Sequence, residues 1–425
     1  MIFFRLCKVM FISLLIKYDF YDNKLLKILL KNVYGCGSIP IKMVQWSLPS
    51  MKIIGINKDI LDIFENSYEK CPIHDIEHTN KQYEIDFNRA LNDDYTIIDV
   101  IGSGSIAQVY KVKDKKNNLY AMKVKHPNSN ENYIIIKRYL LIFFTIFKFN
   151  KLIPVSLYDF LKQFEEQLNF INESNNIMKF NDLYKNHPLY KIPTLLKVSE
   201  NIIIMEYLEG KPLESVKQNN IKYSKYNLFI YTFINNNLAI NNFNHGDLHN
   251  YNWKISSDKK VVIYDYGLCW ELKYPVILDH LHLLLDGLYE HNDDKIYHSF
   301  KNMILLNSSI DENIIKTYYD KNMNGKINRF IDYSKNLMIF SIKNCIILEI
   351  SLIYIIISWQ NTLIIFMKNY DKEDNFDHNS VYTEEYNICD HYNMLPEYQT
   401  YLKNQIKKYE KNDEIDYNKL NKFID

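Results

Sequence analysis

The sequence predicts an α+β fold, in which a helical extension precedes a small antiparallel sheet and a mainly helical C-terminal part. Apolar residues recur at helical spacing before residue 94, and the two-residue alternation of strands begins at residue 95. The polar cluster 114–118 is typical of a hairpin turn, so the strands on either side of it should pair antiparallel. Beyond Gly267 the pattern is again mostly helical.

Each further element is predicted from its own periodicity or turn residues. In the extension, helices are expected over residues 19–34, 58–69 and 80–92. Strands are expected over 97–101, 107–112, 120–125, 195–198, 202–206 and 261–264, and helices over 131–149, 157–186 and 223–243. Gly210, just after the strand 202–206, is interpreted as a hinge.

Composition limits the classes of protein to which the chain can belong. Its 425 residues are 47% hydrophobic and 24% charged, as expected for a globular chain with a sizeable core. The formal net charge is +0, so no nucleic-acid partner is expected. The six cysteines are scattered without C-x-x-C pairs, which predicts a reducing, intracellular environment. The residue usage is typical of an AT-rich genome, so the compartment stays open between a mitochondrion and the cytoplasm of a cellular or viral host.

Two apolar segments raise the question of a membrane. The first, residues 1–17, is basic, but its apolar run is too short to span a bilayer, and a mitochondrial presequence is the alternative. The second, residues 345–367, is long enough, but Glu349, Gln360 and Asn361 interrupt it. We therefore expect a buried C-terminal helix there, with membrane or lipid association as the alternative.

Three oxygen-bearing side chains stand at the separations used by phosphoryl-transfer sites. Asp247 and Asn252 have the spacing of the H-R-D-x-x-x-x-N loop of kinases, and Asp265 begins a D-Y-G turn after an apolar strand. Phosphoryl transfer requires a carboxylate that orients the nucleophile and oxygen ligands that hold magnesium on the phosphates. We expect Asp247 to be the catalytic base, and Asn252 and Asp265 to bind Mg²⁺.

These residues also have structural interpretations. Asp247 and Asp265 could each serve only the local turn in which they lie. His245 and His249 could form a metal pair, but a kinase-type histidine braces its loop by packing and hydrogen bonds. Zinc is therefore not expected.

A glycine-containing turn and a lysine predict where phosphates would bind. Glycines let backbone N–H groups approach phosphate oxygens, although the same residues could merely form a hairpin. Lys123 favours the phosphate site, because it lies in a strand sequence similar to the V-A-I-K of kinases. The cofactor-binding residues expected from this turn and its strands are Gly102, Ser103, Gly104, Ser105, Ala107, Val109, Lys123 and Glu206.

Lys123 needs a counter-charge, because an unpaired buried ammonium group costs roughly several kcal/mol. Glu173, on the helix expected to pack against the sheet, is the predicted partner. With Asp247, Lys123 and Glu173 make up the expected catalytic set. Glu165 and Glu166 are local competitors, and a solvated helix face is the other interpretation of Glu173.

Together these motifs resemble those of the UbiB-like atypical kinase family, also called aarF-domain-containing kinases. The resemblance extends from about residue 34 to about residue 289, and the motifs follow the family's order. The matching segments are 41–46 (K-x-G-Q), 74–75 (L-H-D), 104–110 (S-I-A-Q-V-H), 123–127 (K-V-Q-H-P), 167–176 (Q-L-D-F-x-x-E-A-x-N) and 245–249 (H-G-D-L-H). The K-x-G-Q segment distinguishes this family from ordinary protein kinases.

The resemblance implies a two-lobed protein-kinase-like fold with a small antiparallel-sheet N-lobe, a mainly helical C-lobe and an N-terminal helical extension over the cleft. The extension would occupy residues 1–94, the N-lobe with a helical insertion 95–209, and the C-lobe 210–425. The family also implies ATP and Mg²⁺ as cofactors and a kinase or ATPase activity. It further implies an unknown protein or lipid acceptor and a link to ubiquinone or other prenyl-lipid metabolism.

Two other functions stay open. A catalytically weak, nucleotide-binding pseudokinase that acts as a lipid or protein-complex scaffold would fit the altered extension and the apolar segment 345–367. Small-molecule kinases of the aminoglycoside and choline types share an H-G-D-L-H-x-x-N loop, although the segment 42–45 argues against them.

The expected regulatory contact between extension and cleft involves Lys42, Gln45, Gln167 and Asn169, and it departs from the family's pattern. Val44 occupies the glycine position, so the backbone cannot follow the family's path if that glycine has a positive φ. The acidic pair that usually faces the lysine is amidated here, to Gln167 and Asn169. We therefore expect Lys42 to lose its ion pair and to keep only hydrogen bonds to amide oxygens.

Overall fold

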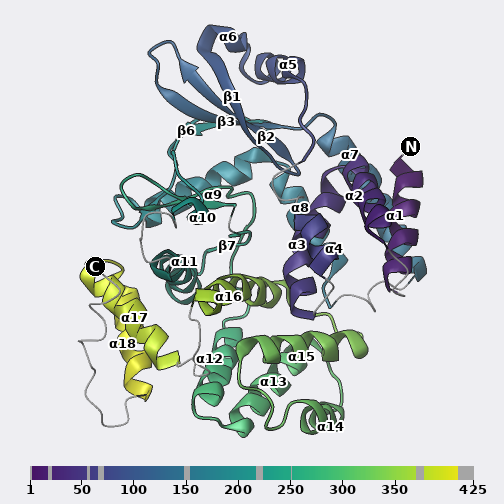
Figure 1. Cartoon of the computed structure of the whole chain (residues 1–425), viewed down its shortest axis with the longest axis vertical. Coiled ribbons are helices and arrows are strands. Elements are labelled where there is room, and N and C mark those ends of the chain that lie inside the picture. Colours follow the sequence, from purple (N-terminus) through teal and green to yellow (C-terminus); the bar gives the residue numbers. More distant parts are fainter. Residues whose placement is uncertain are drawn as a thin grey trace.

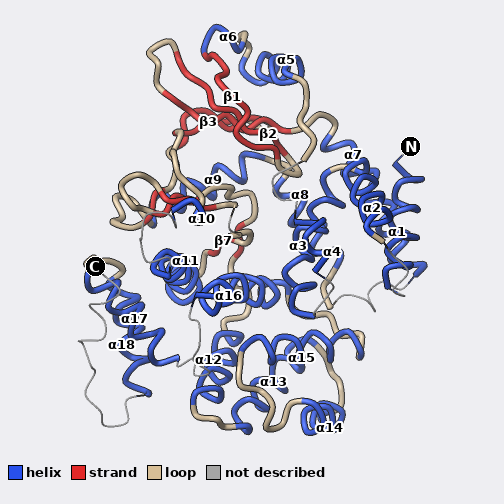
Figure 2. Tube along the Cα trace, in the orientation of Figure 1, coloured by secondary structure: helices blue, strands red, loops and turns tan. Residues whose placement is uncertain are grey.

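The structure is a computed structural model that describes residues 2–17, 22–54, 58–65, 71–147, 154–216, 224–249, 251–369 and 378–409. A small lobe built on a sheet lies above a larger helical lobe, and the N-terminal helices line one side of both (Figure 1). Strands are concentrated in the upper lobe and helices in the lower one (Figure 2). The predicted two-lobed α+β fold is confirmed.

The N-lobe is a five-stranded antiparallel sheet with the order β1-β2-β3-β6-β5. Its strands are β1 Tyr95–Ser103, β2 Ala107–Asp114, β3 Leu119–Lys125, β5 Leu195–Val198 and β6 Ile202–Glu206. Because side chains alternate between the faces of a strand, Met122 and Val124 pack beneath Tyr83 of the extension, whereas Ala121 and Lys123 face the C-lobe. The alternation therefore delivers Lys123 to the space between the lobes.

The extension consists of short helices that end at identifiable breaks. They are α1 Ile2–Lys17, α2 Asn23–Cys36, α3 Ser38–Ile54, α4 Lys58–Glu65, α5 Ile76–Phe87 and α6 Leu91–Asp94. Gly37, with φ 95°, ends α2 in a conformation that favours glycine. The single helix predicted over 80–92 is wrong, because Asn88 adopts the left-handed conformation (φ 54°) and separates α5 from α6. The last residues of the predicted helix 58–69 lie outside the described residues.

Three helices connect the sheet strands β3 and β5. They are α7 Ser129–Phe147, α8 Leu157–Gln167 and α9 Phe170–Leu183. The single helix predicted over 157–186 is wrong, since Asn169 has an extended backbone and its side chain accepts a hydrogen bond from the Ile171 N–H at 2.9 Å. Asparagine is favoured as a helix N-cap, so a new helix begins there. This new start gives α9 the direction that brings Glu173 to the sheet.

The C-lobe surrounds short strands with helices. Its helices are α10 Leu213–Val216, α11 Ser224–Asn236, π-helix η3 Asn237–Asn241, α12 Val276–Tyr289, α13 Asp293–Asn307, α14 Glu312–Asn322, α15 Phe330–Lys343, α16 Ile350–Asn369, α17 His378–His391 and α18 Pro396–Tyr409. The short strands are β4 Tyr190–Lys191, β7 Asn244–His245, β8 Trp253–Ile255, β9 Val261–Ile263 and β10 Cys269–Trp270. The α-helix predicted up to residue 243 is wrong in its last part, where η3 and then Asn242 (φ 44°) turn the chain into β7.

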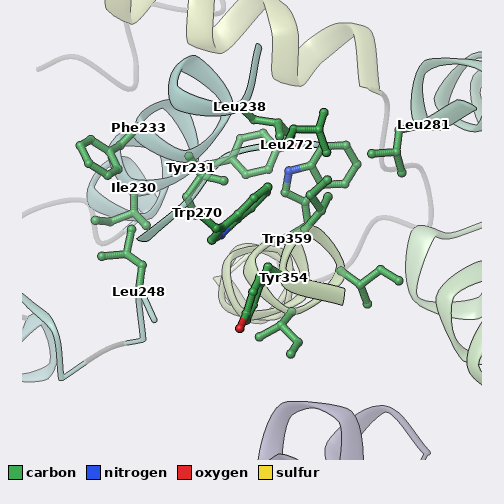
Figure 3. Close-up of a cluster of buried hydrophobic side chains, with 14 of the residues drawn as sticks. Ile230, Tyr231, Phe233, Leu238, Leu248, Trp270, Leu272, Leu281, Tyr354 and Trp359 are labelled. Atoms are coloured by element: carbon green, nitrogen blue, oxygen red, sulfur yellow. The ribbon is translucent and has the colours of Figure 1, made fainter. Parts of the chain in front are cut away.

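The hydrophobic core of the C-lobe packs against the paired strands β7 and β10. Trp270 pairs with Asn244 across the two strands β7 and β10, and its ring stacks on Tyr354 of α16 with 5.8 Å between ring centroids (Figure 3). Residues 352–357 of α16 are buried, as predicted for a C-lobe helix, and the side chains beyond Trp359 lie outside the described part. Among the described residues, no helix combines the length and apolarity needed to cross a bilayer.

Phe180 of α9 provides a test of this core. Its fully buried ring lies 5.6 Å from Phe233, 4.9 Å from Phe243 and 5.2 Å from Tyr266, measured between centroids. Phe180→Ala should lower the free energy of unfolding by about 3–5 kcal/mol, because it leaves a cavity. Met178→Ala, on the exposed side of the same helix, should change it by about 0.5 kcal/mol. Urea denaturation measures both, and equal losses would contradict the packing described here.

Candidate active site

A cavity of about 630 Å³ lies between the sheet and the short strands of the C-lobe. Every residue predicted to bind a cofactor lines it, namely Gly102, Ser103, Gly104, Ser105, Ala107, Val109, Lys123 and Glu206. Glu173, Asn252 and Asp265 line the same cavity from the helix α9 and from the C-lobe. Segments separated by more than a hundred residues in the sequence therefore meet at one space of the size that small-molecule sites have.

Lys123 lies between two carboxylates. Its Nζ donates to Oε1 and Oε2 of Glu173 at 2.7 and 2.9 Å, and to Oδ1 of Asp265 at 2.9 Å. Glu173 is 1% exposed. Of the two competing glutamates, Glu165 accepts from Lys137 Nζ at 2.8 Å and Glu166 is exposed. The structure thus brings Lys123 together with Glu173 and not with either competitor.

The charges of this group stabilise each other. Burial opposes protonation of Lys123, but Asp265 and Glu173 outweigh it and hold the pKa of the lysine above its ordinary value. Burial likewise opposes ionisation of Asp265, yet the ammonium groups of Lys123 and Lys42 hold the pKa of that carboxyl well below its ordinary range. Asp265 is therefore ionised at neutral pH, the form in which an aspartate binds a metal ion.

The turn after β9 presents this carboxylate through a strained backbone. Asp265 has a φ of 55°, a left-handed conformation that non-glycine residues adopt infrequently. The N–H of Gly267 donates to Asp265 Oδ1 at 3.4 Å. A Cβ at Gly267 would lie 3.3 Å from that same oxygen and 3.5 Å from Glu173 Oε2. Glycine at this position therefore lets the turn approach the carboxylate pair closely.

Asp247 does not line the cavity, because Lys42 of the extension lies against it. The Lys42 ammonium group forms an ion pair and a hydrogen bond with Asp247 Oδ2. The expectation that Lys42 loses its ion pair is therefore wrong. Its partner is Asp247, instead of the acidic pair that Gln167 and Asn169 replace in this chain. Burial opposes ionisation of Asp247, but Lys42 outweighs it and lowers the pKa of the carboxyl. Lys42 itself lines the cavity.

The segment that carries Lys42 forms a regular helix. Residues 41–46 lie inside α3, so Val44 has a helical backbone and no glycine-like conformation is needed there. Gln45 is buried on the same helix. Of the amidated pair, Gln167 lines the cavity and donates from Nε2 to the Gln163 carbonyl at 3.2 Å, whereas Asn169 caps α9. The two amides thus have separate roles, and Asn169 positions the helix that holds Glu173.

The loop between β7 and β8 is braced by His245. Its Nε2 lies 3.0 Å from the Tyr264 carbonyl, which can only accept, and its Nδ1 accepts from the Asp247 N–H at 3.2 Å. His245 is therefore the neutral Nε2–H tautomer, and burial lowers its pKa accordingly. Asn252 Nδ2 donates to the Asp247 carbonyl at 2.8 Å, which leaves its Oδ1 as the atom suited to a metal.

Among the described residues, no group of three or more His, Cys, Asp or Glu side chains is placed to hold a metal ion. His249 lies beside Asp247, and burial lowers the pKa of its imidazole. The residues available to a cation are therefore the oxygen donors Asn252 and Asp265, which face the cavity.

Several cavity residues were not predicted from the sequence. Tyr207 and Leu208 follow β6, and the Leu208 carbonyl accepts from the Tyr264 hydroxyl at 2.9 Å. Ala121 and Met205 line the cavity from the sheet. Ala121 is two residues from Lys123 on β3, a spacing that could have identified it, whereas Met205 is placed by its pairing with Ala121. Lys254 had no such signal, because strand alternation in the short β8 is too brief to read.

Comparisons with known proteins found a matching family model, a similar curated protein and a similar solved structure. The family model described as "ABC1 atypical kinase-like domain" matches residues 67–300. The "Probable serine/threonine-protein kinase abkC" of Dictyostelium discoideum is 27% identical over an alignment of 241 residues, which covers 52% of this chain and 34% of that relative. This chain thus spans about a third of that relative's length. A solved structure described as the complex of Rv3197 with erythromycin, from Mycobacterium tuberculosis, is similar with a TM-score of 0.46 and 15% identity, over 70% of this chain and 84% of that one.

The Lys42–Asp247 pair predicts an acid dependence of stability. The folded-state pKa values of Asp247 and Asp265 are lowered, so the stability these groups contribute is complete above about pH 4 and is lost as the pH falls through the folded values. Lys42→Met removes a counter-charge from both carboxylates and should raise their pKa values. Stability at pH 7 should then be lower than in the wild type, and the further loss on acidification should be smaller, because that loss grows with the gap between the unfolded and folded pKa values.

Urea midpoints measured between about pH 3 and pH 7 test this prediction. Lys24→Met, which changes an exposed lysine of α2 in the same way, is the matched control and should follow the wild type. Identical acid limbs for Lys42→Met and the wild type would show that Lys42 does not hold these carboxylates ionised.

Proposed function

The chain belongs to the ABC1 atypical kinase-like family, and we propose that it binds ATP with Mg²⁺ and transfers or hydrolyses the terminal phosphate. The observation that carries this proposal is the convergence of Lys123, Glu173 and Asp265 in one cavity that Asn252 also faces. Phosphoryl transfer relies on positioning and on electrostatic stabilisation rather than on a covalent intermediate, and this cluster supplies both. Asp247 would orient the attacking group.

The cavity suits the parts of a nucleotide triphosphate. The glycine-containing turn Gly102–Ser105 offers backbone N–H groups to phosphate oxygens, and the Lys123 ammonium group offers a positive charge. Val109, Ala121 and Met205 supply apolar surface suited to a flat base. The proposal therefore places the phosphates near Lys123 and the base near Met205.

The magnesium ligands fit a cation that the nucleotide helps to bind. Mg²⁺ is usually held by one or two protein oxygens together with phosphates and waters. Asp265 supplies a carboxylate and Asn252 an amide oxygen, and the Tyr264 N–H donates to the Asn252 carbonyl at 2.8 Å, which joins their two segments. When bound, the ion would neutralise charge on the phosphates. Lys123 could then be shared between Glu173 and the nucleotide.

The acceptor of the phosphate stays open. A protein or a lipid acceptor is compatible with the cavity, and the link to ubiquinone or other prenyl-lipid metabolism rests on the family resemblance. The curated relative is named as a serine/threonine kinase, which favours a hydroxyl group as the acceptor.

One observation favours a second function, that of a nucleotide-binding pseudokinase with a scaffold role. Lys42 occupies the carboxylate of Asp247, the group that would orient a nucleophile. A carboxylate held in an ion pair is a weaker hydrogen-bond acceptor for a hydroxyl or a water. The ion pair between Lys42 and Asp247 would therefore slow turnover without blocking nucleotide binding.

The two functions are distinguished by measuring both binding and turnover on the full chain. Mg-ATP at about a hundred times its dissociation constant should stabilise the folded state by about 2.7 kcal/mol, and the ATP hydrolysis rate is measured with and without detergent and lipid. Asp265→Asn should abolish the Mg²⁺-dependent part of both signals. Asp247→Asn should lower turnover by about 10²–10⁴-fold and leave Mg-ATP binding in place.

Asp258→Asn is the matched control, because Asp258 is an exposed C-lobe aspartate that pairs with Lys191. It should change neither signal. Equal hydrolysis rates in the wild type and in Asp265→Asn would remove the enzyme proposal. Stabilisation by Mg-ATP without turnover, unchanged by Asp247→Asn, would establish the scaffold alternative.

A further inference from the structure

A chain of hydrogen bonds joins the extension to the glycine-containing turn. His74 lies just before α5, and its Nδ1 is 2.8 Å from the Nδ1 of His126, which follows β3. The Nε2 of His126 is 3.0 Å from the carbonyl oxygen of Gly104. The proposed function assigns no role to either histidine, although they connect the extension to Gly104, which lines the cavity.

The hydrogen positions in this chain follow from its chemistry. The Gly104 carbonyl can only accept, so His126 donates from Nε2, and its neutral Nδ1 must accept. His74 therefore donates from Nδ1 to His126. The Nε2 of His74 must then accept, and the Thr79 hydroxyl, 2.9 Å away, is its donor.

The other end of the chain fixes the same direction. The His74 backbone N–H donates to Gln108 Oε1 at 2.8 Å, so the Gln108 amide nitrogen is the atom that donates to the Tyr110 hydroxyl at 2.8 Å. The Tyr110 hydroxyl lies 2.7 Å from the Thr79 hydroxyl and is free to donate to it. The hydrogen bonds thus run in one direction from the His74 N–H through Gln108, Tyr110 and Thr79 back to the His74 imidazole, and from there through His126 to the Gly104 carbonyl.

This chain orients one peptide of the turn. In a trans peptide the carbonyl and the following N–H point in opposite directions. The Gly104 carbonyl oxygen points toward His126, so the N–H of Ser105 points away from His126. Gly104 and Ser105 both line the cavity. The His126 N–H also donates to the Ile106 carbonyl at 2.9 Å, which fixes the turn at a second point.

We propose that His74 and His126 are positioning residues, which hold the Gly104–Ser105 peptide so that the Ser105 N–H is presented to a nucleotide phosphate. The inference rests on the proposed binding of Mg-ATP and deepens it, since it makes the segment before α5 part of the nucleotide site. Additional contacts of that segment support it. The Cys71 N–H donates to the Ser103 carbonyl at 3.3 Å, and the Ser103 hydroxyl donates to the Pro72 carbonyl at 3.2 Å.

The arrangement requires both imidazoles to be neutral. A proton added to the Nδ1 lone pair of His126 would set two N–H groups against each other at 2.8 Å, and a proton added to Nε2 of His74 would remove the acceptor of the Thr79 hydroxyl. The titratable groups that face the pair are His78, whose ring lies 4.8 Å from His74 and whose Nε2 donates to the Lys125 carbonyl, and Tyr110. Burial, followed by the neighbouring histidines, lowers the pKa of His74 to about 3, and burial lowers the pKa of His126.

Two measurements on the full chain test the inference. Long-range ¹H–¹⁵N spectra of the imidazoles, recorded without nucleotide, should show His74 as the Nδ1–H tautomer and His126 as the Nε2–H tautomer, both neutral at about pH 6. Titration calorimetry with Mg-ATP and with adenosine then separates phosphate binding from base binding.

His126→Phe and His74→Phe keep an aromatic ring but cannot continue the chain. Each should weaken Mg-ATP binding about 5-fold, the effect of one hydrogen bond, and leave adenosine affinity unchanged, because adenosine has no phosphate. His74→Asn places an amide N–H where the Nδ1–H of His74 stood and should restore most of the Mg-ATP affinity. His282→Phe, whose imidazole lies 2.7 Å from the Tyr401 hydroxyl in the C-lobe, should leave both affinities unchanged.

The outcomes separate this inference from the proposed function. Mg-ATP binding by the wild type that both phenylalanine variants retain would overturn the inference alone, as would a His126 that titrates near pH 6.5 in the free protein. Equal losses for Mg-ATP and adenosine would show a general structural role and would also overturn it. A wild type that binds no Mg-ATP would overturn the proposed function and this inference together.

Discussion

The buried ammonium group of Lys123 is the constraint on which the rest of the site depends. It lies on β3, and its two partners come from α9 and from the turn after β9, so one charge joins the N-lobe to the C-lobe. A buried ion pair that loses one partner costs about 3–5 kcal/mol, so none of the three segments can shift alone. Three local features place these side chains together. The register of β3 positions Lys123, the N-cap at Asn169 positions the helix of Glu173, and the turn after β9 positions Asp265.

A second ammonium group extends the cluster to the extension. Lys42 and Lys123 face the three carboxyl groups of Glu173, Asp247 and Asp265, and burial raises the pKa of Glu173, so the site holds no excess of positive charge. Such a site favours a cation, and a nucleotide can enter only with its charge compensated. Metal and nucleotide binding should therefore depend strongly on each other.

The sequence allowed the fold and the residues around the cavity to be predicted wherever local pattern and chemistry coincide. The V-A-I-K-like strand predicted Lys123 at the phosphate site, and motif spacing predicted Asn252 and Asp265 as metal ligands; all three line the same cavity. The breaks at Asn88 and Asn169 were missed, because an asparagine inside a helical pattern shows its capping role only once the backbone is known. The Lys42–Asp247 pair was missed because nothing local indicates which of several distant carboxylates a lysine will reach.

The extension contacts the candidate site at two points that differ in chemistry. At the base of the cavity Lys42 binds a carboxylate by charge, whereas at the turn His74 acts through neutral hydrogen bonds. If nucleotide binding changes either contact, the affinity of the extension for the two lobes must change by the same free energy, because coupling between sites is reciprocal. The charged contact would respond to the added phosphates, while the neutral chain would persist. The extension could then remain attached at the turn while it releases Asp247.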